Sequence, residues 1–283
     1  SQRGRGSIAE RNAKLILMVG VLGVSASAIL VRFSQAPSGV TAAYRLGWTV
    51  LLLLPVVLLR CRAELRRVTA RDLVLCGASG VLLALHFLTW FESLKRTSVA
   101  SSTVLVSTEV IFTALGFALF LHGKIPRLGV WAILLAFGGS ALLALSGGGG
   151  AGELSGNLLA LAAASAAAVY TLIGRIQRGH LSTTVYTFLT YLACFLTLLL
   201  GTAAAGTPLT GYGGREWLIG LALAVLCTLL GHSPFSWCLK YLSPSYVSAA
   251  KLCEPVFSSL AAIPLFGEVP GPLQLEIGRA SCR

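Results

Sequence analysis

The sequence predicts an all-α, polytopic membrane protein built from two inverted five-helix repeats, on the grounds of its composition, its apolar runs and its internal similarity. Hydrophobic residues make up 55% of the 283 residues and charged residues only 11%, whereas a soluble domain carries about 25% charged residues. The net charge of +12 does not indicate a nucleic-acid partner, because the basic residues form short clusters between apolar runs. We therefore expect the protein to be embedded in membrane lipid.

Apolar runs divide the chain into candidate membrane spans, each of which needs about 20 residues as a helix. Short loops rich in Gly, Pro or Ser separate the runs. The predicted spans lie near 14–33, 38–59, 73–94, 98–121, 128–146, 156–175, 182–201, 217–239 and 245–266. A tenth span begins near Pro270, and we expect it to be incomplete.

The spans group into two copies joined by a glycine-rich loop. We expect a cytoplasmic segment at 1–13, a first copy (helices 1–5) at 14–146, the loop at 147–155, and a second copy (helices 6–9 and the start of 10) at 156–275. Residues 276–283 resemble translated adapter DNA, so we interpret them as a non-native tail and leave them out of the fold.

Lys and Arg residues are unequally divided between alternate loops. Fourteen lie in the N-terminal segment and the even-numbered loops, and four lie in the odd-numbered loops. Cytoplasmic loops are enriched in Lys and Arg. We therefore expect a multi-pass protein of a bacterial or archaeal inner membrane, with its N-terminus in the cytoplasm.

An ordered set of residues recurs in the two halves of the chain. The offset is 148 at Leu94 and Leu242 but 145 at Glu109 and Glu254, which suggests three extra residues between these points in the first copy. An odd number of helices per copy inverts the second copy in the membrane, and inverted repeats are typical of transporters. The matched pairs are His86 with His232, Trp90 with Trp237, Leu94 with Leu242, and Glu109 with Glu254.

Two stretches resemble a known family. Residues 90–100 and 107–112 (WFESLKRTSVA and STEVIF), and later 231–244 and 251–257 (KLCEPVF), are similar to the two halves of an EamA transporter of the drug/metabolite transporter (DMT) superfamily. The similarity extends over residues 14–275. It implies ten helices, cytoplasmic termini and a central cavity for export of amino acids and related metabolites. The sequence departs from the family after Glu109, where a proline is usual, and at 122–124, where His-Gly-Lys replaces Gly-Glu-Arg.

Among the ionisable residues inside predicted spans, four stand out: Arg45, Glu109, Lys251 and Glu254. Placing Arg, Lys or Asp at the centre of a span costs about 2.5–3.5 kcal/mol, so these are candidate transport residues. A carboxylate would bind a substrate ammonium, and Arg45 or Lys251 would bind a substrate carboxylate. The alternative is internal pairing, of Lys251 with Glu254 at i,i+3 and of Arg45 with Glu109. Arg45 is also close enough to a span end to snorkel.

Further candidates are aromatic, histidine and proline residues. His86 and His232 either line a cavity, where they bind substrate or titrate, or bond to neighbouring helices; a metal role lacks a ligand set, and no metal or cofactor is expected. Trp90 and Trp237 either wall the cavity or anchor at the interface. Pro255 bends its helix as a pivot or as a static kink.

The function expected from these residues is alternating-access export of an amino acid-like small molecule, with proton coupling through the acids or histidines as an option. A nucleobase or drug-like substrate is the alternative within the same superfamily. An intramembrane lipid-modifying enzyme would gather its polar residues on one membrane side, whereas here they are distributed between both copies. A structural protein would not need ionisable residues in its spans.

Overall fold

The computed structural model describes residues 2–123, 131 and 151–267. Within this part of the chain, eight helical segments are long and apolar enough to cross a membrane. The predicted all-α polytopic fold is confirmed. The predicted span at 128–146 lies outside the described residues except at position 131, as do the start of the tenth span and the tail at 276–283.

The first four of these segments belong to the first copy. They are formed by α1 with α2 (Gln2–Ser25, Ser27–Phe33), α3 (Ser38–Arg60), α5 (Ala70–Arg96), and α6 with α7 (Val99–Val106, Glu109–Phe120). The other four are formed by α9 (Ala151–Gln177), α10 (Thr183–Ala204), α11 with η1 and α12 (Gly214–Ala222, Leu223–His232, Ser233–Cys238), and α13 with η2 and α14 (Pro244–Ala250, Lys251–Cys253, Glu254–Phe266).

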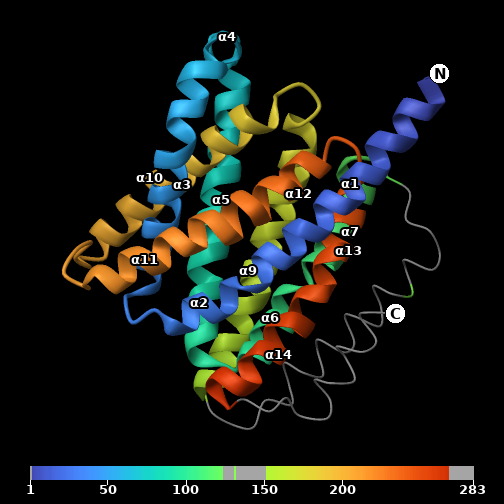
Figure 1. Ribbon diagram of the computed structural model, residues 1–283. Helices are drawn as coiled ribbons and strands as arrows, with labels where there is room; N and C mark the ends of the chain where they lie inside the picture. The colour runs from blue at the N-terminus through green and yellow to red at the C-terminus, as the bar shows by residue number, and fades with distance from the viewer. Residues whose placement is uncertain (1, 124–130, 132–150, 268–283) are drawn as a thin grey trace.

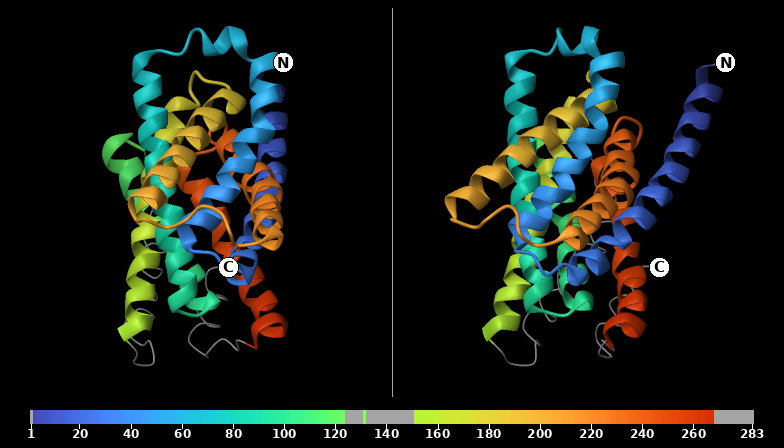
Figure 2. Two further views of the ribbon diagram at one scale, coloured as in Figure 1. Left: turned by 90° about the vertical axis from the view of Figure 1, so that its left-hand side faces the viewer. Right: turned by 60° about the vertical axis from the view of Figure 1, so that its left-hand side comes forward.

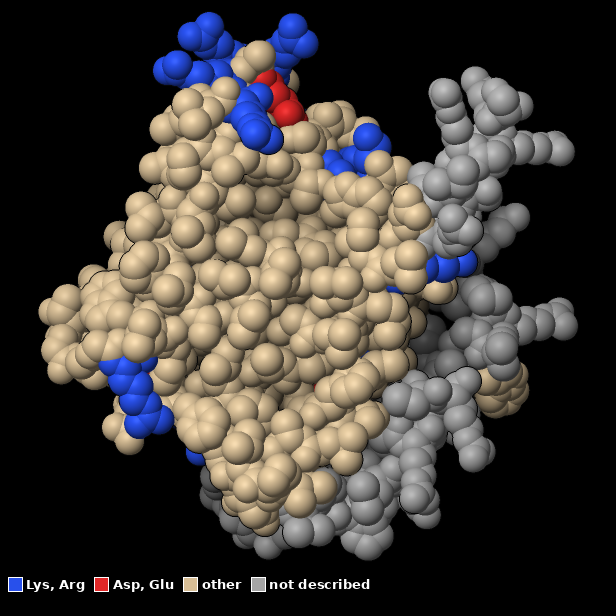
Figure 3. Space-filling view, viewed as in Figure 1, with Lys and Arg blue, Asp and Glu red and all other residues tan. Residues whose placement is uncertain are grey.

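The bundle has two distinct ends. The short helix α4 (Arg62–Leu65) connects α3 to α5 at one of them (Figure 2). The N-terminus and the α9–α10 and α12–α13 connections lie at this same end, which we call the α4 end (Figure 1). The α2–α3 and α5–α6 connections lie at the other end, which we call the α2–α3 end. Lys and Arg gather over α4, and few charges lie on the face between the ends (Figure 3).

Hydroxyl side chains start several of the helices by capping them. Ser98, Ser182 and Ser243 each accept a hydrogen bond from the backbone N–H three residues later. Thr69 forms a reciprocal capping box with Asp72 at the start of α5. Such caps satisfy N–H groups that have no partner within the helix. They set where these spans begin.

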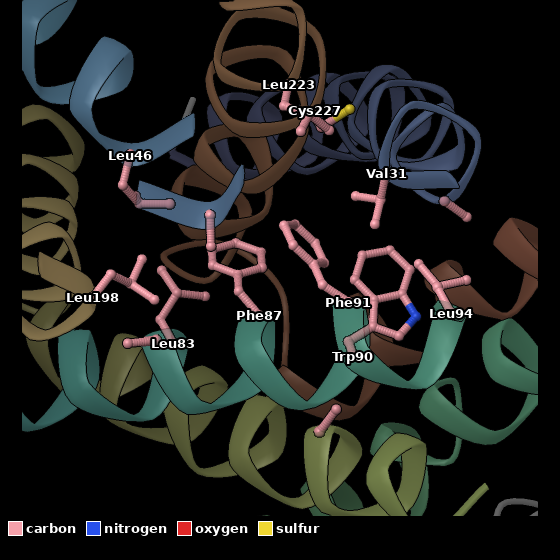
Figure 4. Close-up of a cluster of buried hydrophobic side chains, with 14 of the residues drawn as sticks. Val31, Leu46, Leu83, Phe87, Trp90, Phe91, Leu94, Leu198, Leu223 and Cys227 are labelled. Atoms are coloured by element: carbon pink, nitrogen blue, oxygen red, sulfur yellow. The ribbon is translucent and has the colours of Figure 1, made fainter. Parts of the chain in front are cut away.

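The core of the bundle is centred on α5. Phe87, Trp90 and Phe91 project from one face of α5 toward Leu46 of α3 and Leu223 of η1 (Figure 4). On its other side α5 packs along α9, where Ala160, Ala163 and other alanines up to Ala168 are buried. Small side chains allow two helices to approach closely in a membrane.

Two spans are interrupted at matching positions. In the first copy, a turn at Ser107 and Thr108 separates α6 from α7. In the second copy, the 3₁₀ turn η2 separates α13 from α14. Glu109 and Glu254 are the first residues of the helices that follow these interruptions. Broken spans are common around the binding sites of transporters with inverted repeats.

The helix caps show where the three extra residues of the first copy lie. The cap residue Ser98 precedes Glu109 by eleven residues, and Ser243 precedes Glu254 by the same number. The three extra residues of the first copy therefore lie between Leu94 and the cap, where the chain joins α5 to α6. The broken spans themselves have equal lengths up to the acid.

Candidate functional site

A small polar cavity lies where the broken spans meet α5 and η1. Its volume, measured over the positions that a water centre can occupy, is about 30 Å³. A space of 10–15 Å³ holds one water, so the cavity admits a water or two but no amino acid in this conformation. Its wall contains six of the predicted site residues: His86, Trp90, Glu109, His232, Lys251 and Glu254.

Glu109 and Lys251 form a buried ion pair that joins the two copies. The Lys251 Nζ atom donates to both carboxylate oxygens of Glu109, at 2.9 and 3.0 Å. Thr171 and Ser248 also donate to Glu109, at 2.9 and 3.2 Å. The predicted pairing of Lys251 with Glu254 is therefore wrong. Spacing along one helix shows which partners are possible, but here the lysine side chain reaches across to α7.

Arg45 is held on α3 by polar but uncharged partners. Its Nε atom donates to Thr228 at 2.7 Å and its Nη1 atom donates to Ser27 at 3.0 Å. The guanidinium lies 4.2 Å from the centre of the Phe87 ring, a favourable cation–π arrangement. The side chain is 0% exposed, so neither snorkelling nor the predicted pairing with Glu109 occurs. Glu109 is bound to Lys251 instead.

Several polar atoms near the cavity have no hydrogen-bond partner among the described residues. Arg45 Nη2, Trp90 Nε1 and His232 Nδ1 are buried and unpaired. Glu254 is also buried, and no described residue donates a hydrogen bond to it. Buried polar groups are nearly always satisfied. Trp90 and His232 stand in the cavity wall, so these two nitrogens are available to a polar ligand there.

Glu254 is placed at the start of α14, where the helix dipole favours a negative charge. Arg45 and Lys251 supply positive charge in its surroundings, and Glu109 supplies negative charge. Pro255 stands within the first turn of α14, where the missing N–H of proline removes no helical hydrogen bond. The proline therefore starts a helix after the 3₁₀ turn instead of kinking a continuous one.

The two histidines meet across the cavity, with ring centres 6.3 Å apart. The His86 Nδ1 atom lies 3.0 Å from the Ala163 carbonyl oxygen, so this nitrogen carries the proton and donates to α9. His86 thus both bonds to a neighbouring helix and lines the cavity. His232 is the last residue of the π-helix η1; π-helical turns are rare and frequent at functional sites.

Trp237 does not join the central site. It is half-buried near the end of α12, where its ring lies 4.6 Å from that of Tyr241. It lines a separate pocket at the α4 end. The matched Trp90 is buried on α5 and stacks on His86, with ring centres 5.8 Å apart. Residues that repeat in sequence therefore occupy different surroundings in the two copies.

Four residues of the site were not predicted from the sequence. Ser27 and Thr228 hold Arg45, and Thr171 and Ser248 hold Glu109. Ser and Thr are common in every span of this chain, so residue type alone carries no signal. In the described part of the chain no group of three or more His, Cys, Asp or Glu is arranged to hold a metal ion.

The fold and the site define a polytopic membrane protein with a polar cavity between two broken spans. Comparison with protein families matches the EamA-like transporter family twice, at residues 12–145 and 154–278. The chain belongs to this family, whose members are membrane transporters of small molecules.

Solved structures include a similar fold. One chain, described only as the crystal structure of a protein, superposes with a TM-score of 0.71 at 20% sequence identity, over 96% of this chain and 95% of its own length. At this identity the similarity concerns the fold. The curated proteins contain no match.

Proposed function

We propose that this protein exports zwitterionic, amino acid-like metabolites by alternating access between its two repeats. The observation that carries the proposal is Glu254 in the cavity wall, to which no described residue donates a hydrogen bond, together with the unpaired Arg45 Nη2 next to Ser27 of the same wall. Glu254 would accept hydrogen bonds from a substrate ammonium, and Arg45 Nη2 would donate to a substrate carboxylate. Charge-assisted hydrogen bonds of this kind are roughly twice as strong as neutral ones.

The balance of charge around the cavity supports a zwitterion. Glu109 and Lys251 neutralise each other at 2.9 Å, which leaves one negative group, Glu254, and one positive group, Arg45. A substrate with one charge of each sign would leave neither group unpaired. An amine without a carboxylate would satisfy only Glu254.

The size of the cavity supports alternating access. A volume of about 30 Å³ is too small for any metabolite, so the spans around it must separate before substrate enters. Transporters with inverted repeats do this by rocking one repeat against the other around a fixed midplane site. We place the α4 end, with its gathered Lys and Arg, in the cytoplasm of a bacterial or archaeal cell.

Flux in proteoliposomes tests the proposal. The protein is reconstituted with a panel of amino acids, their decarboxylated amines and purines, with and without a pH gradient. Saturable flux of at least one amino acid is the expected result. Flux of purines alone would favour a nucleobase transporter, and no flux for any compound would refute the exporter. Stimulation by the gradient would identify proton coupling.

The substitution Glu254→Gln tests the site itself. Loss of a charge-assisted bond to the ammonium is expected to weaken apparent substrate affinity about 10- to 100-fold, while the folded protein remains. Glu153→Gln, which removes an acid at the start of α9 outside the cavity wall, is the matched control. Wild-type flux in Glu254→Gln would reduce Glu254 to a structural role.

A further inference from the structure

A second polar pocket opens at the α4 end of the bundle. Its volume is about 540 Å³, far larger than that of the central cavity. Residues at the adjoining ends of α9, α10 and α12 line it, including Arg178, Thr183 and Trp237. No role for this pocket follows from the central site alone.

Of these three helices, α12 contributes a residue to the wall of the central cavity, and α9 and α10 each pack against α12. On α12, Trp237 lines the outer pocket, and Phe235 lines the central cavity. On α9, Arg178 marks the outer pocket just beyond the helix, and the Tyr170 ring lies 6.3 Å from that of His232 at the cavity. The seam between α9, α10 and α12 therefore runs from one space to the other.

Buried hydroxyl groups follow this seam. The Tyr170 hydroxyl pairs with Ser236 at 3.3 Å, and the Tyr191 hydroxyl pairs with Ser233 at 3.2 Å. Both tyrosines are buried, at 5% and 0% exposure. Burying a hydroxyl in an apolar region is unfavourable unless it is hydrogen-bonded, and an apolar side chain would pack a purely structural seam without that cost.

These hydroxyl pairs are long for their kind, because O–H···O bonds are most often 2.7–2.8 Å. The α2–α3 end is closed by shorter, charge-assisted bonds. There the Ser34 hydroxyl donates to the Glu216 carboxylate at 2.6 Å, and Lys95 Nζ donates to the Ala36 carbonyl oxygen at 2.6 Å. Two arginines also hold the seam toward the α4 end, because Arg178 Nε donates to the Ser236 carbonyl oxygen at 3.0 Å and Arg175 Nη1 donates to the Leu239 carbonyl oxygen. Opening the seam therefore has to break these bonds together with the hydroxyl contacts.

We propose that substrate passes between the central cavity and the α4-end pocket along the seam of α9, α10 and α12, with Tyr170 and Tyr191 and their serine partners as its closed gate. This route rests on the proposed transport function. A polar substrate then binds in the outer pocket before or after it passes the gate. The gate opens when α12 separates from α9 and α10.

Cysteine accessibility in oriented vesicles tests the route. The seven cysteines of the chain are replaced, and Ser236→Cys is treated with a membrane-impermeant methanethiosulfonate from each side. Labelling from the α4 side is expected. Ser258→Cys is the control, because Ser258 is equally buried but lies on α14, bonded to the Ser25 carbonyl oxygen at 3.0 Å; it is expected to stay unlabelled from that side.

Absence of labelling of Ser236→Cys from the α4 side, or equal labelling of the two cysteines, would overturn the route. Ser233→Cys serves in the same assay if Ser236→Cys fails to fold. Flux is measured separately on the unsubstituted protein, so the two proposals fail independently. If Ser236→Cys is not labelled but flux is normal, only the route is rejected. If Ser236→Cys is labelled but there is no flux, only the transport function is rejected.

Removing one gate hydroxyl sharpens the test. Tyr191→Phe deletes the bond to Ser233 and is expected to raise the labelling rate of Ser236→Cys about 2- to 10-fold, the effect of one ordinary hydrogen bond on an opening equilibrium. Tyr212→Phe removes a hydroxyl bonded to Pro208 in the α10–α11 connection and is expected to leave the rate unchanged. An equal change in the labelling rate for both variants would show that the effect does not depend on the gate hydroxyl.

Discussion

The two broken spans share one construction but hold their acids differently. Both begin at a capping serine and carry a glutamate eleven residues later, as the first residue of the next helix. In the first copy, Glu109 receives four hydrogen bonds from three side chains. In the second copy, Glu254 receives none from the described residues.

A single lysine accounts for this difference. Lys251 stands three residues before Glu254, and Val106 stands at the corresponding place before Glu109. There is thus one lysine for two glutamates, and Lys251 binds Glu109, the acid of the other copy, at 2.9 Å. The two copies thus carry matching acids, one of which links the copies while the other stands in the cavity wall without a bonded partner among the described residues.

The largest expected effect comes from neutralising each acid in turn. Glu109→Gln is expected to lower the free energy of unfolding by about 3–5 kcal/mol, because it leaves Lys251 buried without its counter-charge. Glu254→Gln is expected to leave stability unchanged or raise it, since it removes an unpaired buried charge. Thermal denaturation in detergent measures both. Equal destabilisation by the two changes would abolish the distinction between the acids.

A double substitution checks the cause of the first effect. Lys251→Met combined with Glu109→Gln removes both charges of the pair, so it is expected to recover much of the stability that Glu109→Gln alone loses. No recovery would mean that Glu109 acts through Thr171 and Ser248 and not through the lysine.

Arg45→Lys is expected to have an intermediate effect on substrate binding. Lysine keeps the positive charge but lacks the planar fork that bonds Thr228, Ser27 and a carboxylate together. Apparent affinity for an amino acid is expected to fall about 10-fold, and affinity for its decarboxylated amine is expected to remain. Competition of the two compounds in the flux assay separates these outcomes; equal losses would exclude a carboxylate contact at Arg45.

The smallest expected effect is the loss of stability on removing the capping serine that begins each broken span. Ser98→Ala and Ser243→Ala each remove one helix cap and are each expected to lower the free energy of unfolding by about 0.5–2 kcal/mol. Similar values in the denaturation assay would show that the capped starts are equivalent. A value near zero for one of them would indicate that the copies differ before the acid as well as after it.

Local patterns in the sequence were sufficient for the spans and for half of the cavity wall. Apolar length predicted the eight described spans. The recurrence of His86 with His232 and of Glu109 with Glu254 made these residues candidates for the site, and all four stand in the cavity wall. Trp237 shows the limit of this reasoning, because its place in the repeat matches Trp90 but its side chain lines the outer pocket. A repeat conveys position along the chain, whereas the rotation of each helix decides which space a side chain faces.

What the sequence alone determined is the bilayer-spanning helical fold, its duplication and the small set of ionisable residues that its spans hold. Apolar length and self-similarity are properties of neighbouring residues, so they can be recognised without coordinates. The tertiary structure decided that Lys251 binds Glu109 across the repeats, that Arg45 rests on Ser27, Thr228 and Phe87, and that Glu254 stays unpaired. Partners so distant along the chain depend on where the helices break and how they pack, and spacing along one helix does not contain that information.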